Sequence, residues 1–174
     1  GQGLYAGAAR RTDLDAAVVA AARRAGVDVR EGHALLGVRD EGHRVVADVE
    51  GLGAVAARYV IAADGMWSPT RRALGLAPEG YRGECHAFRQ YLRGVDPEAL
   101  RGLWVWFEAD VLPGYAWSFP LADGSVNVGF GIHRGSRITV GDMADAWRSL
   151  LQRPAVTEVL GSLGPVLHKH PELA

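Results

Sequence analysis

The stretch Tyr115-Ala116-Trp117-Ser118-Phe119-Pro120, followed after eight residues by Gly129-Phe130-Gly131, organises the sequence. Its aromatic residues recur at every second position, which places Tyr115, Trp117 and Phe119 on one face of a β-strand. In a second strand, four apolar residues alternate with small or polar ones: Val126, Val128, Phe130 and Ile132 against Asn127, Gly129 and Gly131. One face of that strand is therefore apolar, and the other has almost no side chains.

The turn between these strands sets which residues face each other. Asp123-Gly124 fits a two-residue turn, which pairs Trp117 with Phe130, and also a three-residue loop over 122–124. We favour the loop, because Gly124 is then its third residue, where a left-handed backbone is needed. This register pairs Tyr115 with Gly131, Trp117 with Gly129 and Phe119 with Asn127. Rings beside glycines would admit a flat or elongated apolar ligand, although plain sheet packing explains the same pattern.

The composition is that of an ordinary globular protein. Of the 174 residues, 48% are hydrophobic and 22% are charged, and the net charge is −1, so no nucleic-acid partner is expected. The single cysteine, Cys85, cannot form an internal disulfide or anchor a metal alone, and we expect no metal site. No apolar run approaches the roughly 18 residues of a membrane-spanning helix, and no signal peptide opens the chain. We therefore expect a cytoplasmic protein.

The first part of the chain is expected to combine a helix with an antiparallel meander. A helix over 14–25, preceded by Thr12 and ended by Gly26, would bury an Ala- and Val-rich stripe that includes Leu14 and Val18. Strands are predicted at 27–30, 33–39, 44–50 and 54–61, and the last continues to Asp64-Gly65. Ser68 then caps a short helix with Pro69 at its first position.

The second part is expected to be an antiparallel sheet followed by two helices. Strands at about 85–94 and 103–109 precede the aromatic hairpin, and we expect Trp104 and Trp106 to pack in a core. Helices are predicted at 141–152, with Met143, Trp147 and Leu150 in its buried stripe, and at 155–163. The domain boundary is placed within 77–83, which gives domains 1–78 and 79–174.

Three motifs occur in a fixed order. They are Arg11-x-x-Leu14-Asp15, Ile61-Ala62-Ala63-Asp64-Gly65-x-x-Ser68-x-x-Arg71, and the aromatic stretch with Gly129-x-Gly131. Together, from about Leu4 to Leu163, they resemble the geranylgeranyl reductase family of FAD-dependent oxidoreductases, which shares its fold with para-hydroxybenzoate-hydroxylase-type monooxygenases. The resemblance implies an α/β (α+β) protein: part of a Rossmann-like FAD-binding domain with a β-meander, and an antiparallel-sheet substrate domain.

The resemblance also assigns cofactor contacts to Arg11, Asp64 and Gly65. Arg11 matches an arginine near the flavin's diphosphate and ribityl side, where a guanidinium at a helix N-terminus would donate to phosphate. The alternative is a surface arginine beside a helix start, which the residues alone favour. Asp64 and Gly65 match the family's Asp-Gly motif beside the cofactor, and the alternative for Asp64 is a structural Asx turn.

The substrate-binding residues implied by the resemblance are those of the family's cavity motif, which takes a long isoprenoid chain. They are Tyr115, Trp117, Phe119, Pro120, Gly129 and Gly131. A hydrocarbon chain gains about 0.8 kcal/mol per buried CH₂, so it needs an apolar wall more than polar anchors. No catalytic acid or base stands out, as expected where a flavin carries the hydride.

The implied function is an FAD-dependent oxidoreductase that reduces C=C bonds of a geranylgeranyl-type substrate, with NADPH or another reductant as electron donor. A flavin-dependent monooxygenase or halogenase is the first alternative, and a non-catalytic lipid- or partner-binding domain is the second. Peripheral contact with a membrane through the substrate is left open. Because no G-x-G-x-x-G loop is present, we expect an internal piece of a longer protein that does not hold FAD tightly alone.

Overall fold

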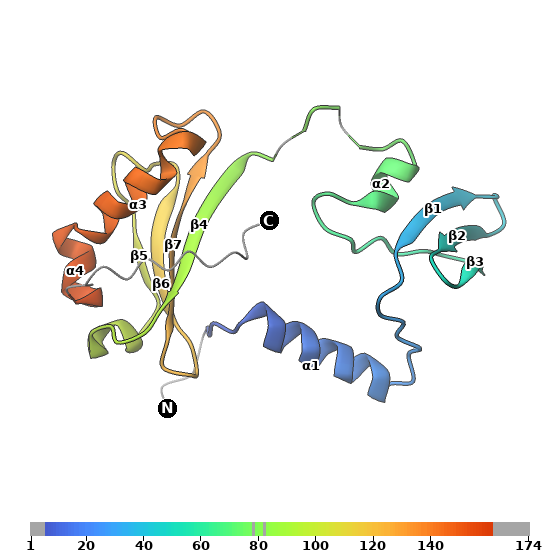
Figure 1. Ribbon diagram of the computed structural model, residues 1–174, viewed down its shortest axis with the longest axis horizontal. Coiled ribbons are helices and arrows are strands. Elements are labelled where there is room, and N and C mark those ends of the chain that lie inside the picture. The colour runs from blue at the N-terminus through green and yellow to red at the C-terminus, as the bar shows by residue number, and fades with distance from the viewer. Residues whose placement is uncertain (1–5, 78, 82, 162–174) are drawn as a thin grey trace. The chain divides into compact units, whose positions relative to one another are not determined.

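The computed structural model describes residues 6–77, 79–81 and 83–161, whose contacts form two compact units (Figure 1). One unit, called here the sheet unit, comprises the described residues up to Ala17 and those from Glu84 onward. The other, the meander unit, comprises Val18–Gly83. The start of the first helix therefore belongs with the second half of the chain. The predicted domain limits at residue 78 stay a prediction about the whole protein.

The meander unit contains a three-stranded antiparallel sheet and one short helix. Strands β1 (Leu35–Asp40), β2 (Val45–Val49) and β3 (Gly53–Ala57) are hydrogen-bonded in sequence order, which confirms the predicted meander. Helix α2 (Pro69–Ala73) begins as predicted, because the Ser68 hydroxyl accepts a hydrogen bond from the Arg71 amide at 2.9 Å and Pro69 needs no amide partner at the first position.

The prediction of a buried apolar stripe on the first helix is wrong. Helix α1 (Arg11–Arg24) has no buried residue, and Leu14 and Val18 are 49% and 60% exposed. The helix begins at Arg11, so Thr12, the predicted cap, lies inside it. Burial of the stripe needs a second element packed against it. No part of the chain that the structure describes covers it.

The strand predicted at 27–30 does not form, and the strand predicted from 54 to 61 ends as β3 at Ala57. Residues 27–30 and 59–63 have no ladder partner, and Tyr59 and Ile61 are 82% and 90% exposed. A β-branched apolar run favours extended backbone, but a strand exists only when a neighbouring strand accepts its hydrogen bonds. The described residues provide none at these positions.

The sheet unit is a four-stranded antiparallel sheet with helices on one face. The strand order is β4 (Cys85–Leu92), β7 (Val126–His133), β6 (Tyr115–Pro120) and β5 (Trp104–Trp106). Short 3-10 helices lie at Pro97–Leu100 and Val140–Asp142, and the α-helices are α3 (Met143–Leu151) and α4 (Pro154–Leu160). Residues 162–163 of the second predicted helix lie outside the described range. No described helix is both long and apolar enough to cross a membrane.

The core lies between the sheet and α3 with α4 (Figure 1). On β7, the predicted apolar residues Val126, Val128, Phe130 and Ile132 are at most 2% exposed. Trp147 of α3 stacks on Phe130, with ring centroids 5.9 Å apart, and its indole N–H donates to Gln90 Oε1 at 2.9 Å. Trp106 is in this core and Trp104 packs against it, as expected. Tyr115, Trp117 and Phe119 alternate with the buried Ala116 and Ser118 and so lie on the opposite face of the sheet, which we call the open face.

Candidate functional site

The aromatic hairpin has the predicted three-residue loop. The Leu121 amide donates to the Ser125 carbonyl at 2.8 Å, and the Gly124 amide donates to the Leu121 carbonyl at 3.1 Å. Gly124 has a φ of +76°, the left-handed conformation that favours glycine. The register pairs Tyr115 with Gly131, Trp117 with Gly129 and Phe119 with Asn127. The structure therefore confirms the predicted pairing.

The three rings of β6 form a ladder on the open face. Ring centroids are 5.8 Å apart between Tyr115 and Trp117, and 6.2 Å apart between Trp117 and Phe119. The Trp117 indole N–H donates to Asn127 Oδ1 at 3.2 Å, which fixes the orientation of the ring. Aromatic pairs at such separations contribute about 0.5–1.5 kcal/mol beyond their burial. The ladder is thus a continuous aromatic wall.

A groove of about 370 Å³ lies along this wall in the sheet unit. Tyr115, Trp117 and Pro113 line it on the β6 side, and the cross-strand pair Ala87 and Gly131 lines it with their small or absent side chains. Cys85 and His133, also paired across strands, line it one step further along. The groove is mostly apolar with a few polar groups, which is the usual character of a small-molecule site.

The groove contains only some of the predicted substrate-binding residues. Tyr115, Trp117 and Gly131 line it, whereas Phe119, Pro120 and Gly129 do not. Phe119 extends the ladder beyond the groove, and Pro120 ends β6 opposite Val126. These three stay predicted contacts for a ligand longer than the groove.

The two glycines of Gly129-x-Gly131 have different surroundings. A Cβ atom on Gly129 would lie 2.5 Å from Trp117 Cζ2 and 2.4 Å from the Phe88 carbonyl oxygen, so the indole occupies this space. A Cβ atom on Gly131 would have one neighbour, the His86 carbonyl oxygen at 3.6 Å. Gly129 therefore makes room for a ring of the wall, and Gly131 leaves room in the groove.

Sequence reasoning missed the loop that closes the groove. A Cβ atom on Gly114 would lie 1.9 Å from the Gly131 carbonyl oxygen, so only glycine permits this approach of two backbones. The Gly114 amide donates to the Val111 carbonyl at 2.9 Å, which holds the loop in place. The Pro113-Gly114 pair signalled a turn in the sequence, but nothing local indicated its contact with β7.

Asp64 has a structural role at the start of α2. Its Oδ2 accepts a hydrogen bond from the Thr70 amide at 2.9 Å. Hydrogen bonds from the Ser68 hydroxyl, and then from the hydroxyl and amide of Thr70, hold the pKa of Asp64 well below its usual range. The Asx-type alternative for Asp64 therefore has direct support, and a cofactor contact by Asp64 stays a prediction.

Acid titration should reveal this role of Asp64. The lowered pKa stabilises the folded state fully above the unfolded-state pKa of about 3.9, and this contribution is lost as the pH falls through the folded-state value. We expect the carboxyl carbon of Asp64, followed by NMR, to titrate well below about 3.9. Thr70→Ala keeps the amide donor and removes the hydroxyl, so it should raise the midpoint partway. An ordinary midpoint in the unchanged chain would contradict the assignment.

Gly65 and its surroundings leave space beside Asp64. Gly65 has a φ of +77°, and a Cβ atom there would meet no atom within 4 Å. A cavity of about 160 Å³ in the meander unit is lined by the neighbouring Met66, Trp67 and Arg71. A backbone turn without a side chain and with open space can admit close approach of a cofactor.

Arg11 is the first residue of α1 and is exposed. Its guanidinium pairs with Asp15, one turn further along the helix, at 3.0 Å. An exposed pair of this kind contributes at most about 0.5 kcal/mol, so a stronger anion could displace Asp15. Arg11 belongs to the sheet unit, and Asp64 and Gly65 belong to the meander unit.

Comparisons with known proteins match one family model and several curated relatives. Residues 4–110 match the model of a family described as an FAD binding domain. Digeranylgeranylglycerophospholipid reductase 2 of Methanopyrus kandleri is 36% identical over 163 residues, which are 90% of this chain and 41% of that protein.

Solved structures share the fold. A geranylgeranyl bacteriochlorophyll reductase-like protein from Thermoplasma acidophilum matches with a TM-score of 0.68 at 26% identity, over 85% of this chain and 39% of its own. The halogenase PltM, solved with phloroglucinol and FAD, matches with a TM-score of 0.66 at 20% identity, over 87% of this chain and 34% of its own. The chain spans about two-fifths of the length of the curated reductases that it matches.

Proposed function

The chain belongs to the FAD binding domain family of oxidoreductases, and from this premise we propose that it is part of a flavoenzyme that reduces C=C bonds of an isoprenoid substrate. The observation that carries the proposal is the apolar groove of about 370 Å³ beside Tyr115 and Trp117. Its size lies within the range of about 300–1,000 Å³ that is typical of small-molecule sites. A prenyl chain, which has no polar group along its length, suits such a lining.

In this proposal the protein's residues bind and orient rather than react. Tyr115 and Trp117 exclude water from one side of the substrate chain, while Ala87 and Gly131 let it lie against the backbone of the sheet. Arg11, Asp64 and Gly65 would contact FAD, for which the open space around Gly65 is suitable. FAD, reduced by NADPH or another donor, would supply the hydride.

The groove can be tested by filling it. Gly131→Val places a side chain where a Cβ atom has one neighbour at 3.6 Å, so the fold should persist while space is lost. Displacing about two CH₂ groups of a ligand corresponds to roughly tenfold weaker binding. We therefore expect the valine variant to bind geranylgeraniol about tenfold more weakly, measured by tryptophan fluorescence and calorimetry, with a similar melting temperature.

The control is the same substitution outside the groove. A Cβ atom on Gly102 would meet no atom within 4 Å, and Gly102 does not line the groove. Gly102→Val should leave affinity unchanged. Equal affinities of the two valine variants, or no binding of geranylgeraniol by the unchanged chain, would refute the groove as the substrate site.

Oxygen-using chemistry is the alternative within the same fold, which the halogenase PltM shares. The curated relative at 36% identity is named a reductase, and this supports reduction. Anaerobic turnover of the whole protein with dithionite-reduced flavin separates the two. A saturated product formed without oxygen supports the proposal, and a strict requirement for oxygen favours a monooxygenase or halogenase.

A further inference from the structure

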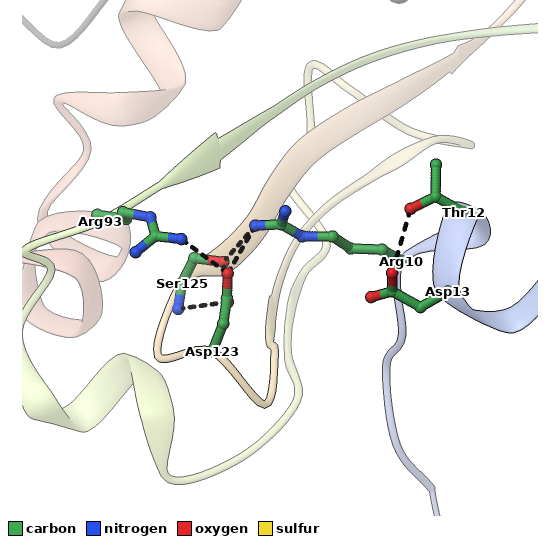
Figure 2. Close-up of polar contacts among 6 residues, drawn as sticks. All are labelled: Arg10, Thr12, Asp13, Arg93, Asp123 and Ser125. Carbon is green, nitrogen blue, oxygen red and sulfur yellow. Dashed lines mark hydrogen bonds and ion pairs between the residues drawn. The ribbon is translucent and has the colours of Figure 1, made fainter.

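A cluster of three arginines lies at the hairpin end of the open face. Arg10 and Arg93 reach Asp123 in the hairpin loop from two sides (Figure 2), at 2.7 and 2.8 Å. The Arg10 guanidinium also lies over the ring of Tyr91, 5.3 Å from its centroid. Arg89 lies over the same ring at 5.8 Å. Residues 89 and 91 alternate with Ala87 along β4, so they share the face that carries the groove.

Asp123 is the carboxylate that holds this cluster. Its Oδ2 accepts from the two arginines. Its Oδ1 accepts hydrogen bonds from the Ser125 amide at 3.1 Å and the Ser125 hydroxyl at 2.5 Å. The Ser125 hydroxyl is the largest cause of a lowered pKa for Asp123, followed by the Ser125 amide and then by the two arginines. Asp123 is therefore ionised at neutral pH, and its oxygens are already engaged.

Arg89 has no carboxylate partner among the residues that the structure describes. It is partly buried, and its neighbour across the strands is Gly129, which lies under the Trp117 indole. Arg10 thus links the two parts of the cluster: it shares the Asp123 carboxylate with Arg93 and the Tyr91 ring with Arg89. The three arginines carry three positive charges, and Asp123 supplies one negative charge among them. A bound anion would remove this imbalance.

We propose that Arg89, with Arg10 and Arg93, forms a binding subsite for a phosphate or diphosphate group. Guanidinium groups donate pairs of hydrogen bonds that match phosphate oxygens, and a doubly charged group would balance the cluster. The subsite lies on the same face as the groove, on the other side of the Trp117 ring. The phosphate would belong to the lipid substrate or to the flavin diphosphate, and only this last step rests on the proposed function.

The first test uses inorganic pyrophosphate and the 174-residue chain in calorimetric titration. Arg89→Gln should weaken binding roughly tenfold or more, as expected for one charge-assisted contact. Arg137→Gln, a change at an exposed arginine outside the cluster, should have no effect. Asp123→Asn removes the competing carboxylate and should tighten binding, although it also weakens the hairpin loop. The two substitutions should therefore change the affinity for pyrophosphate in opposite directions, which a loss of stability alone would not do.

The second test identifies the source of the phosphate. Weaker binding of geranylgeranyl diphosphate but not of ADP to Arg89→Gln assigns the subsite to the lipid headgroup, and the reverse assigns it to the flavin diphosphate. The proposal is overturned if pyrophosphate does not bind, if Arg89→Gln and Arg137→Gln behave alike, or if Asp123→Asn weakens binding. Uncharged geranylgeraniol tests the groove alone, so its failure to bind would count against the proposed function and not against this subsite.

Discussion

Gly129→Ala should destabilise the sheet unit by about 3 kcal/mol or more, at the upper end for an overpacked site. The new Cβ atom would lie 2.4 Å from the Phe88 carbonyl oxygen, 2.5 Å from Trp117 Cζ2 and 3.0 Å from Arg89 Cβ. The indole can rotate, but the carbonyl belongs to the β4 backbone, which is paired along its length with β7. Relief therefore requires separation of the edge strand β4 from the central strand β7. Urea denaturation followed by tryptophan fluorescence measures the loss.

Two further variants locate the cause. Gly131→Ala makes the same change two residues along β7, where the Cβ atom would be 3.6 Å from its nearest neighbour, and it should alter stability by less than about 1 kcal/mol. Trp117→Leu in the Gly129→Ala background removes the ring but not the carbonyl, so it should restore little. Full restoration by leucine, or equal losses at the two glycines, would show that the backbone contact is not the cause.

Trp147→Ala should destabilise the sheet unit by about 3–5 kcal/mol, the usual cost of removing a buried aromatic side chain. Trp147 is 2% exposed, and it packs on Phe130 at 5.9 Å and on Phe88 at 5.4 Å. Its loss would leave a cavity between α3 and the sheet. It would also remove the hydrogen bond that the indole N–H donates to Gln90 Oε1 at 2.9 Å, and Gln90 is only 5% exposed.

Trp147→Phe separates the two contributions. Phenylalanine keeps most of the ring packing but removes the donor to Gln90, so the expected loss is about 1–3 kcal/mol, the cost of an unsatisfied buried polar group. Trp147→Phe with Gln90→Leu removes both polar partners and should recover part of that loss. A loss below about 1 kcal/mol for Trp147→Ala would contradict the described core, and chemical denaturation of the four chains decides this.

Local chemistry in the sequence determined the elements whose partners are near in the chain. The position of Gly124 favoured the correct hairpin register, because the third residue of a three-residue loop needs a left-handed backbone. Ser68 and Pro69 set the start of α2, and the alternation from Val126 to Ile132 marked the face that joins the core. The family resemblance was also carried by short motifs, and the comparisons support it.

Contacts between distant residues were decided only by the tertiary structure. The groove exists because the loop at Gly114 touches the backbone of Gly131, and the cationic cluster exists because Arg10 reaches Asp123, 113 positions away. The same dependence explains the failures: the stripe on α1, the strand at 27–30 and the predicted strand beyond Ala57 had the right residues but no described partner. A pattern of side chains expresses a preference, and burial or a hydrogen-bonded ladder requires a second segment whose position no local pattern encodes.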